Sequence, residues 1–141
     1  IDGDGRPDII TANFSDNNIA VFRNTATACA INSGSLAARV NFTMTQALAA
    51  TVADIDGDGK LDVVAVGGSS TMSIFRNTAS SGTITSGSFA AKVDFTATNA
   101  TSLAIGDIDA DGKADIVTAS YSNSVLSIFK NTATSGVVNS S

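Results

Sequence analysis

The sequence predicts an all-β protein, and three observations lead to this expectation. Helix formers other than alanine are scarce, whereas Thr, Val, Ile, Ser, Asn and Gly are frequent, a balance typical of strands and turns. Short apolar runs of strand length alternate with turn residues. The pattern also repeats, because the equivalent residues Asp2, Asp56 and Asp109 stand 54 and 53 positions apart. A fixed period of this length indicates repeated β-units rather than a unique fold.

Each unit carries the same landmarks in the same order. An aspartate-rich loop comes first, and a phenylalanine motif follows it at Ala20–Thr25, Ser73–Thr78 and Ser127–Thr132. A third landmark, Ser33–Thr43, matches Ser86–Thr96. We therefore divide the chain into units of about 1–53, 54–106 and 107–141, all parts of one partial domain that spans 1–141.

Four apolar segments recur in each unit, and we expect each to be a strand. In the middle unit they are Thr51–Ala53, Asp62–Val66, Met72–Phe75 and Phe89–Phe95. The second is apolar on both faces, as a strand buried on both sides would be. Four antiparallel strands in about 53 residues is the pattern of a β-propeller blade. We expect ten strands, divided three, four and three, which make about two and a half blades with open edges that permit self-association.

The charge of the chain is concentrated in the loops. All thirteen acidic residues are aspartates, eleven of them lie in the three loops, and the net charge is −5. An acidic chain without a basic patch argues against nucleic acid as a partner. No apolar run approaches the roughly 18 residues of a membrane-spanning helix. The single cysteine, Cys29, cannot form an internal disulfide.

The middle loop, Asp54–Asp62, has carboxylates at its positions 1, 3, 5 and 9 and glycine at position 6. Like charges this close repel one another, so a bound cation would stabilise the loop. A ligand set of oxygens without His or Cys suits Ca²⁺. An EF-hand is excluded because position 12 is Ala65 rather than glutamate. The alternative is a set of tight Asp-Gly turns without an ion.

The loop pattern Asp-x-Asp-x-Asp-Gly-x-x-Asp, the following Asp-Val-Val or Asp-Ile-Val, and Ser-Ile-Phe-Arg-Asn-Thr resemble the FG-GAP/VCBS repeat family. This family includes the propeller of integrin α-chains and repeats of many secreted bacterial proteins. The resemblance implies a propeller, often seven-bladed, with Ca²⁺ in the hairpin between the first two strands of a blade. It also implies that the chain is a fragment of a longer secreted bacterial protein.

On this basis the candidate calcium ligands can be assigned in each loop, with side-chain carboxylates from Asp and backbone carbonyls from Lys or Arg. Gly59 and Gly112 would take positive φ at the bend. In the first loop the position-1 ligand is absent, so we expect that site to be weak or empty. The candidates are Asp54, Asp56, Asp58, Lys60 and Asp62 in the middle loop, Asp107, Asp109, Asp111, Lys113 and Asp115 in the last, and Asp2, Asp4, Arg6 and Asp8 in the first.

Other repeated residues have structural interpretations. We expect Asn24, Asn77 and Asn131 to close turns by bonding their own backbone, and Arg23, Arg76 and Lys130 to lie at solvated strand ends. A layer of aromatic rings is expected between the blades. Its members are Phe22, Phe42, Phe75, Phe95 and Phe129.

The function expected from the sequence is a calcium-stabilised extracellular binding or adhesion module that is not an enzyme. No nucleophile and base can be paired, since the chain lacks histidine. Its partner would be a protein or glycan on the cell surface or matrix. One alternative is a lectin-like propeller that contacts sugar through Phe14 and Tyr121, which lie in turns. Another is a scaffold attached to an enzyme outside this segment.

Overall fold

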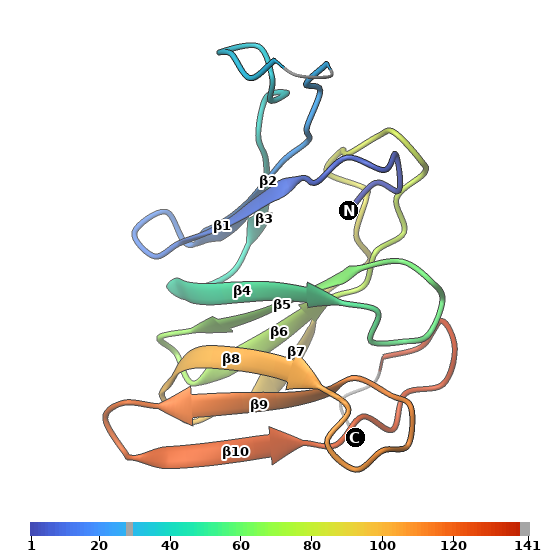
Figure 1. Ribbon diagram of the computed structural model, residues 1–141. Helices are drawn as coiled ribbons and strands as arrows, with labels where there is room; N and C mark the ends of the chain where they lie inside the picture. Colours follow the sequence, from blue (N-terminus) through green and yellow to red (C-terminus); the bar gives the residue numbers. More distant parts are fainter. Residues whose placement is uncertain (28–29, 139–141) are drawn as a thin grey trace.

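Three antiparallel β-sheets lie side by side in the computed structural model, which describes residues 1–27 and 30–138 (Figure 1). Cys29 lies outside the described residues. Every regular secondary-structure element in the described residues is a β-strand, so the predicted all-β fold is confirmed. No helix in this part of the chain is long and apolar enough to cross a membrane.

The ten strands divide three, four and three, as expected. Within each sheet, strands that follow one another in sequence are hydrogen-bonded neighbours. The first sheet contains β1 (Ile9–Asn13), β2 (Asn18–Phe22) and β3 (Val40–Thr43). The middle sheet contains β4 (Ala47–Ala53), β5 (Asp62–Gly67), β6 (Thr71–Phe75) and β7 (Val93–Thr96), and the last sheet contains β8 (Ala100–Gly106), β9 (Asp115–Ser120) and β10 (Val125–Phe129).

Two strands of the middle sheet begin four residues away from the start that the sequence predicts. β4 begins at Ala47, four residues before the predicted Thr51, and its register shifts between Ala47 and Ala49 as at a β-bulge. The fourth strand of the middle sheet begins only at Val93, so the prediction that it starts at Phe89 is wrong. Phe89 instead forms an isolated bridge with Asn77 and turns its ring into the core.

The middle sheet is the centre of the packing because both of its faces are covered. All six residues of β5 are buried, which confirms the prediction of a strand buried on both sides. Side chains alternate across a strand. Val63 and Ala65 therefore face a core shared with the first sheet, and Val64 and Val66 face a core shared with the last.

Aromatic rings fill the first of these cores. Phe42 of the first sheet meets Phe89 of the middle unit edge to face, with ring centroids 4.8 Å apart. Phe75 completes the cluster at 6.5 Å from Phe42 and 6.4 Å from Phe89. Such pairs add about 0.5–1.5 kcal/mol each beyond the burial of their area. The predicted aromatic layer is confirmed for Phe42 and Phe75 in this core and for Phe95 and Phe129, which pack against the second core, whereas Phe89 was not expected in it.

The stacking separates two kinds of connection. The aspartate loops lie on the right in Figure 1, and the β1–β2, β5–β6 and β9–β10 hairpin turns lie on the left. The hairpin turns use left-handed backbone at Asn17, Ser70 and Ser124, with φ of 52°, 58° and 51°. The β1–β2 turn is one residue longer than the β5–β6 turn, which accounts for the one-residue difference between the two periods.

Candidate metal centres in the aspartate loops

The middle loop joins β4 to β5 and folds back on its own carboxylates. The backbone N–H of Asp58 donates to Oδ1 of Asp54 and to Oδ1 of Asp56, both at 3.1 Å. Gly59 N–H donates to Oδ2 of Asp54 at 2.9 Å. Gly59 has φ of 86°, a conformation that favours glycine, so its predicted role at the bend is confirmed.

Three carboxylates of this loop come together. Asp54, Asp56 and Asp58 each offer an oxygen, and these oxygens lie within 4.8 Å of one another. In the last loop the corresponding group consists of Asp107, Asp109 and Asp115. Both groups can hold a metal ion. The carbonyl-ligand roles predicted for Lys60 and Lys113 stay predictions.

The ninth-position aspartates tie the loop to the end of the third strand. Asp62 is fully buried, and its carboxylate accepts from the backbone N–H groups of Ile55 at 3.0 Å and Asn77 at 2.7 Å. Asp115 accepts in the same way from Ile108 and Asn131. Asp62 is not a member of the middle cluster of three, whereas Asp115 belongs to the last one. Their part in holding an ion remains a prediction.

One oxygen of the middle loop is buried and unpartnered. Asp56 is 2 % exposed, and its Oδ2 has no hydrogen bond among the described residues. The nearest cation is Arg76, whose Nε lies 4.0 Å from this oxygen. Burial raises the pKa of Asp56, and burial likewise raises the pKa of Asp62. A buried oxygen without a donor, beside other carboxylates, fits a hard divalent cation.

The last loop is partly neutralised by a lysine. The ammonium of Lys130 contacts the Asp109 carboxylate and lies 3.3 Å from Oδ2 of Asp111. The hydrogen bond to Asp109 raises the pKa of Lys130. The expectation that Lys130 lies at a solvated strand end is therefore incomplete, because its exposed side chain returns to the loop. Lys130 and Asp109 are 21 positions apart, and the sequence pattern did not predict their contact.

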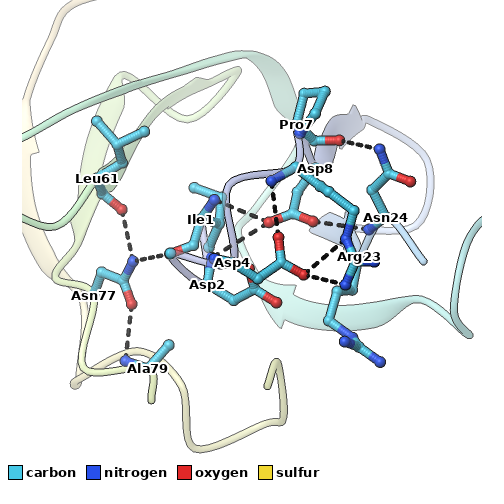
Figure 2. Close-up of polar contacts among 12 residues, drawn as sticks. Ile1, Asp2, Asp4, Pro7, Asp8, Arg23, Asn24, Leu61, Asn77 and Ala79 are labelled. Atoms are coloured by element: carbon cyan, nitrogen blue, oxygen red, sulfur yellow. Dashed lines mark hydrogen bonds and ion pairs between the residues drawn. The ribbon is translucent and has the colours of Figure 1, made fainter. Parts of the chain in front are cut away.

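The first loop has a different arrangement. The Arg6 guanidinium bonds Oδ2 of Asp4 at 2.6 Å through Nη2, and this bond lowers the pKa of Asp4. Asp8 accepts from the Ile1 ammonium at 2.9 Å and from the Asn24 N–H at 2.8 Å (Figure 2). Asp2, like Asp56, keeps a buried Oδ2 without a partner in the described chain. These residues form no cluster of three acids among the described ranges.

The repeated asparagines connect neighbouring sheets, a role that the sequence interpretation missed. The Oδ1 of Asn77 accepts from Ala79 N–H at 2.9 Å, which confirms the predicted turn. Its Nδ2 also donates to Leu61 O of its own loop and to Ile1 O of the preceding loop, both at 2.9 Å (Figure 2). Asn131 repeats this arrangement with Ile55 and Ala114. The sequence feature that could have indicated this role is the recurrence of Asn at the end of the third strand of each unit.

The two aromatic residues proposed from the sequence as sugar contacts lie in hairpin turns. Phe14 is 47 % exposed in the β1–β2 turn, and Tyr121 is 89 % exposed in the β9–β10 turn. These turns lie opposite the aspartate loops in Figure 1. The two kinds of candidate site are therefore separated by the length of the strands.

Comparison with known families agrees with this architecture. A family model described as "FG-GAP-like repeat" matches residues 1–65 and 54–118, and one described as "FG-GAP repeat" matches residues 99–138. No curated protein and no solved structure matches the chain. The first match to the FG-GAP-like model runs from the first aspartate loop into β5. The second match runs from the middle aspartate loop into β9. The chain belongs to the FG-GAP-like repeat family.

Proposed function

We propose that this chain is a calcium-stabilised, noncatalytic binding module that works outside the cell. The observation that carries the proposal is the buried, unpartnered Oδ2 of Asp56 beside the carboxylates of Asp54 and Asp58. FG-GAP repeats are typical of extracellular or surface proteins, and they are generally binding or structural modules rather than enzymes. Loops of this kind suit the millimolar calcium concentrations found outside cells.

The residues of the middle loop would share the work of holding the ion. Asp54, Asp56 and Asp58 supply carboxylate oxygens, Lys60 its carbonyl, and Asp62 a carboxylate that is already fixed by two backbone N–H groups. The corresponding set in the last loop is Asp107, Asp109, Asp111, Lys113 and Asp115. A bound ion supplies positive charge that offsets the repulsion among these groups. Its role is structural, since it stabilises a hairpin that the neighbouring sheet also contacts.

Calcium binding and thermal stability test this proposal directly. We expect the melting temperature to rise with Ca²⁺ and to fall in a chelator, because a ligand that binds only the folded state stabilises it. Mg²⁺ at the same concentration serves as the control for ionic strength. Asp56→Asn should remove the part of the effect that comes from the middle loop and leave the part from the last loop, whereas Asp16→Asn, outside the loops, should leave the whole effect unchanged. A melting temperature indifferent to calcium and chelator would refute a structural calcium site.

The partner surface is assigned to the hairpin turns rather than to the aspartate loops. The β1–β2, β5–β6 and β9–β10 turns lie together at one end of the stacked sheets (Figure 1). Turns on a rigid scaffold commonly carry recognition. The module would there contact a protein or glycan of the cell surface or matrix.

A carbohydrate ligand is the second candidate, and one observation favours it. Tyr121 is 89 % exposed at a turn, and an aromatic ring presented in this way can stack on a sugar. We expect glycan-array binding to be lost in Tyr121→Ala and weakened in Phe14→Ala. Leu61→Ala, an exposed apolar residue in an aspartate loop, is the control. Binding to protein ligands but to no glycan would reject the lectin alternative.

A further inference from the structure

A short segment of the last unit, residues 131–136, holds the backbone of the middle aspartate loop. Asn131 donates through Nδ2 to the carbonyl of Ile55 at 2.8 Å, and the N–H of Gly136 donates to the carbonyl of Asp56 at 3.2 Å. Asp56 also carries the buried Oδ2 without a hydrogen-bond partner in the described chain. The segment therefore orients the backbone of the residue on which the proposed calcium site rests.

The same segment is fixed to the loop of its own unit. The N–H of Asn131 donates to Oδ1 of Asp115 at 2.8 Å, and its Nδ2 also donates to the carbonyl of Ala114 at 3.1 Å. Asp115 belongs to the cluster of three carboxylates in the last loop. Asn131 is only 9 % exposed, so water competes little for these bonds. One residue thus contacts a candidate ligand of the last loop through its backbone and the middle loop through its side chain.

The path of hydrogen bonds continues through the middle loop. Ile55, whose carbonyl accepts from Asn131, donates its own N–H to Oδ2 of Asp62 at 3.0 Å. Oδ1 of Asp62 accepts from the N–H of Asn77, and the side chain of Asn77 donates to the carbonyl of Ile1 (Figure 2). The ninth-position aspartates of the last and middle loops are therefore joined by a continuous path, and the same pattern leads on to the first loop.

Charge alone would couple the middle and last loops in the unfavourable sense. Each loop contains four aspartates and one lysine, and Lys130 adds a further positive charge at the last one. A divalent ion in one loop weakens the negative potential that attracts an ion to the other. Salt at about 0.15 M screens this effect beyond about 8 Å. An increase in affinity between the loops would therefore have to come from the hydrogen-bonded path.

From this path we propose that Asn131 is a positioning residue of the middle calcium site and couples it to the last one, so that occupancy of either loop raises the affinity of the other. The inference rests on the proposed calcium function. Fixing the Asp115 carboxylate around an ion also fixes the backbone of Asn131, and with it the amide that orients the Ile55 carbonyl. The second ion then meets a loop that is already ordered and has less conformational freedom to lose.

Three calorimetric titrations with Ca²⁺ measure the coupling. Asp109→Asn disables the last loop and gives the association constant of the middle one, whereas Asp56→Asn gives the constant of the last. With both loops intact, the product of the two constants should exceed the product of the single-loop constants by at least about fivefold, the lower end of typical allosteric coupling. All three chains carry Asp4→Asn so that the first loop adds no binding. The ratio of the two products is the coupling factor.

Replacing Asn131 identifies the residue that transmits the coupling. Asn131→Ser keeps an oxygen that can close the turn but lacks the amide donors of asparagine. We expect the coupling factor to fall to one or below, while both loops still bind Ca²⁺. Asn77→Ser is the matched control, because it removes the equivalent bond to Ile1 and leaves the path between the middle and last loops in place. Circular dichroism checks that both variants fold.

Hydrogen exchange follows the same path without replacing Asn131. In Asp109→Asn only the middle loop binds, and Ca²⁺ should slow exchange of the Asn131 N–H, which donates to Asp115 in the other loop. The N–H of Val137 is the control, since it donates to Thr134 within the last unit and lies off the path. Equal slowing of both amides would indicate general stabilisation and would contradict the inference.

The outcomes separate the coupling from the proposed function. Loops that bind no Ca²⁺ would refute both. Loops that bind Ca²⁺ with a coupling factor of one or less in the chain with both loops intact would refute the coupling and leave the calcium sites standing. A factor that is unchanged in Asn131→Ser, or lost to the same extent in Asn77→Ser, would overturn the role assigned to Asn131.

Discussion

The side-chain amide of Asn77 donates to the backbone carbonyl of Ile1 over 2.9 Å, although 76 positions separate the two residues in sequence. Asn131 makes the equivalent bond to Ile55 at 2.8 Å, again across 76 positions. Gly82 and Gly136 extend each contact, because their N–H groups donate to the carbonyls of Asp2 and Asp56. An aspartate loop is thus held both by its own carboxylates and by the sheet that follows it.

Replacing these asparagines should show that the tie between sheets matters for stability. Asn77 is fully buried, so Asn77→Ala leaves several backbone groups without partners and should cost about 2–4 kcal/mol. Asn131→Ala should cost a similar amount or less. Asn24→Ala is the matched comparison, since Asn24 makes no bond to another sheet in the described structure, and should cost about 1 kcal/mol. Urea denaturation measures all three, and equal losses would contradict the role assigned to the tie.

Lys130 should compete with a cation for the last loop. Its ammonium contacts Asp109 and lies close to Asp111, so Lys130→Gln should raise the Ca²⁺ affinity of this loop severalfold. The measurement is calorimetric titration in an Asp56→Asn background, which removes the middle site. Arg76→Gln, tested with the middle loop intact, is the control and should have a smaller effect, since Arg76 stays 4.0 Å from Asp56. An unchanged affinity in Lys130→Gln would show that the lysine moves aside without cost.

The metal-free protein should become more stable as the pH falls from neutrality towards 3.8. Burial raises the pKa values of Asp56 and Asp62 above this ordinary value, so the folded state binds protons that the unfolded state does not. Below 3.8 the trend should reverse. The backbone bond from Asn131 lowers the pKa of Asp115, and bonds from Lys92 and Ser73 outweigh burial to lower that of Asp94. Stability from these two groups is lost as the pH falls through their lowered pKa values.

Thermal melts in chelator across this range test the expected maximum. Asp56→Asn should flatten the rise above 3.8, because it removes one of the two groups responsible. Calcium-loaded protein should behave in the opposite way over the same range, since protons and the ion compete for the same carboxylates. A metal-free protein that only loses stability on acidification would contradict the buried environment of Asp56 and Asp62.

Much of the fold follows from local sequence, but contacts between units do not. The period and the apolar segments predicted the three, four and three strands because each strand is defined by residues next to one another. Phe89 was assigned to a strand because its neighbours alternate, yet its ring completes a cluster with Phe42 of another sheet. Only the stacking of the sheets determines that position.

The loops show the same division between local and distant information. Spacing alone made all four carboxylates of the middle loop equivalent. In the structure Asp62 is fixed by N–H groups of Ile55 and Asn77, whereas Asp56 keeps an unpartnered buried oxygen. These differences depend on Asn77 and the covering sheet, which lie outside the nine-residue motif.

Ala110 occupies a loop position that prefers glycine, and this gives the last expectation. Its φ is 61°, while Gly57 at the equivalent position has 70°. Left-handed backbone costs a residue with a side chain roughly 1–2 kcal/mol, and glycine avoids this strain. Part of that advantage is offset, because glycine has greater conformational freedom in the unfolded chain. Ala110→Gly should therefore stabilise the protein by up to about 1 kcal/mol, and Gly57→Ala should destabilise it by a similar amount.

The reciprocal pair separates backbone strain from packing. A Cβ at Gly57 would have no heavy atom within 4 Å, so Gly57→Ala introduces no clash and reports the backbone alone. Gly67→Ala is the contrasting variant, because its Cβ would lie 2.3 Å from the carbonyl oxygen of Thr45 and should cost considerably more. Denaturation in the presence of chelator keeps metal binding out of the comparison. If Ala110→Gly destabilised the protein instead, the last loop would have to fold differently from the middle one.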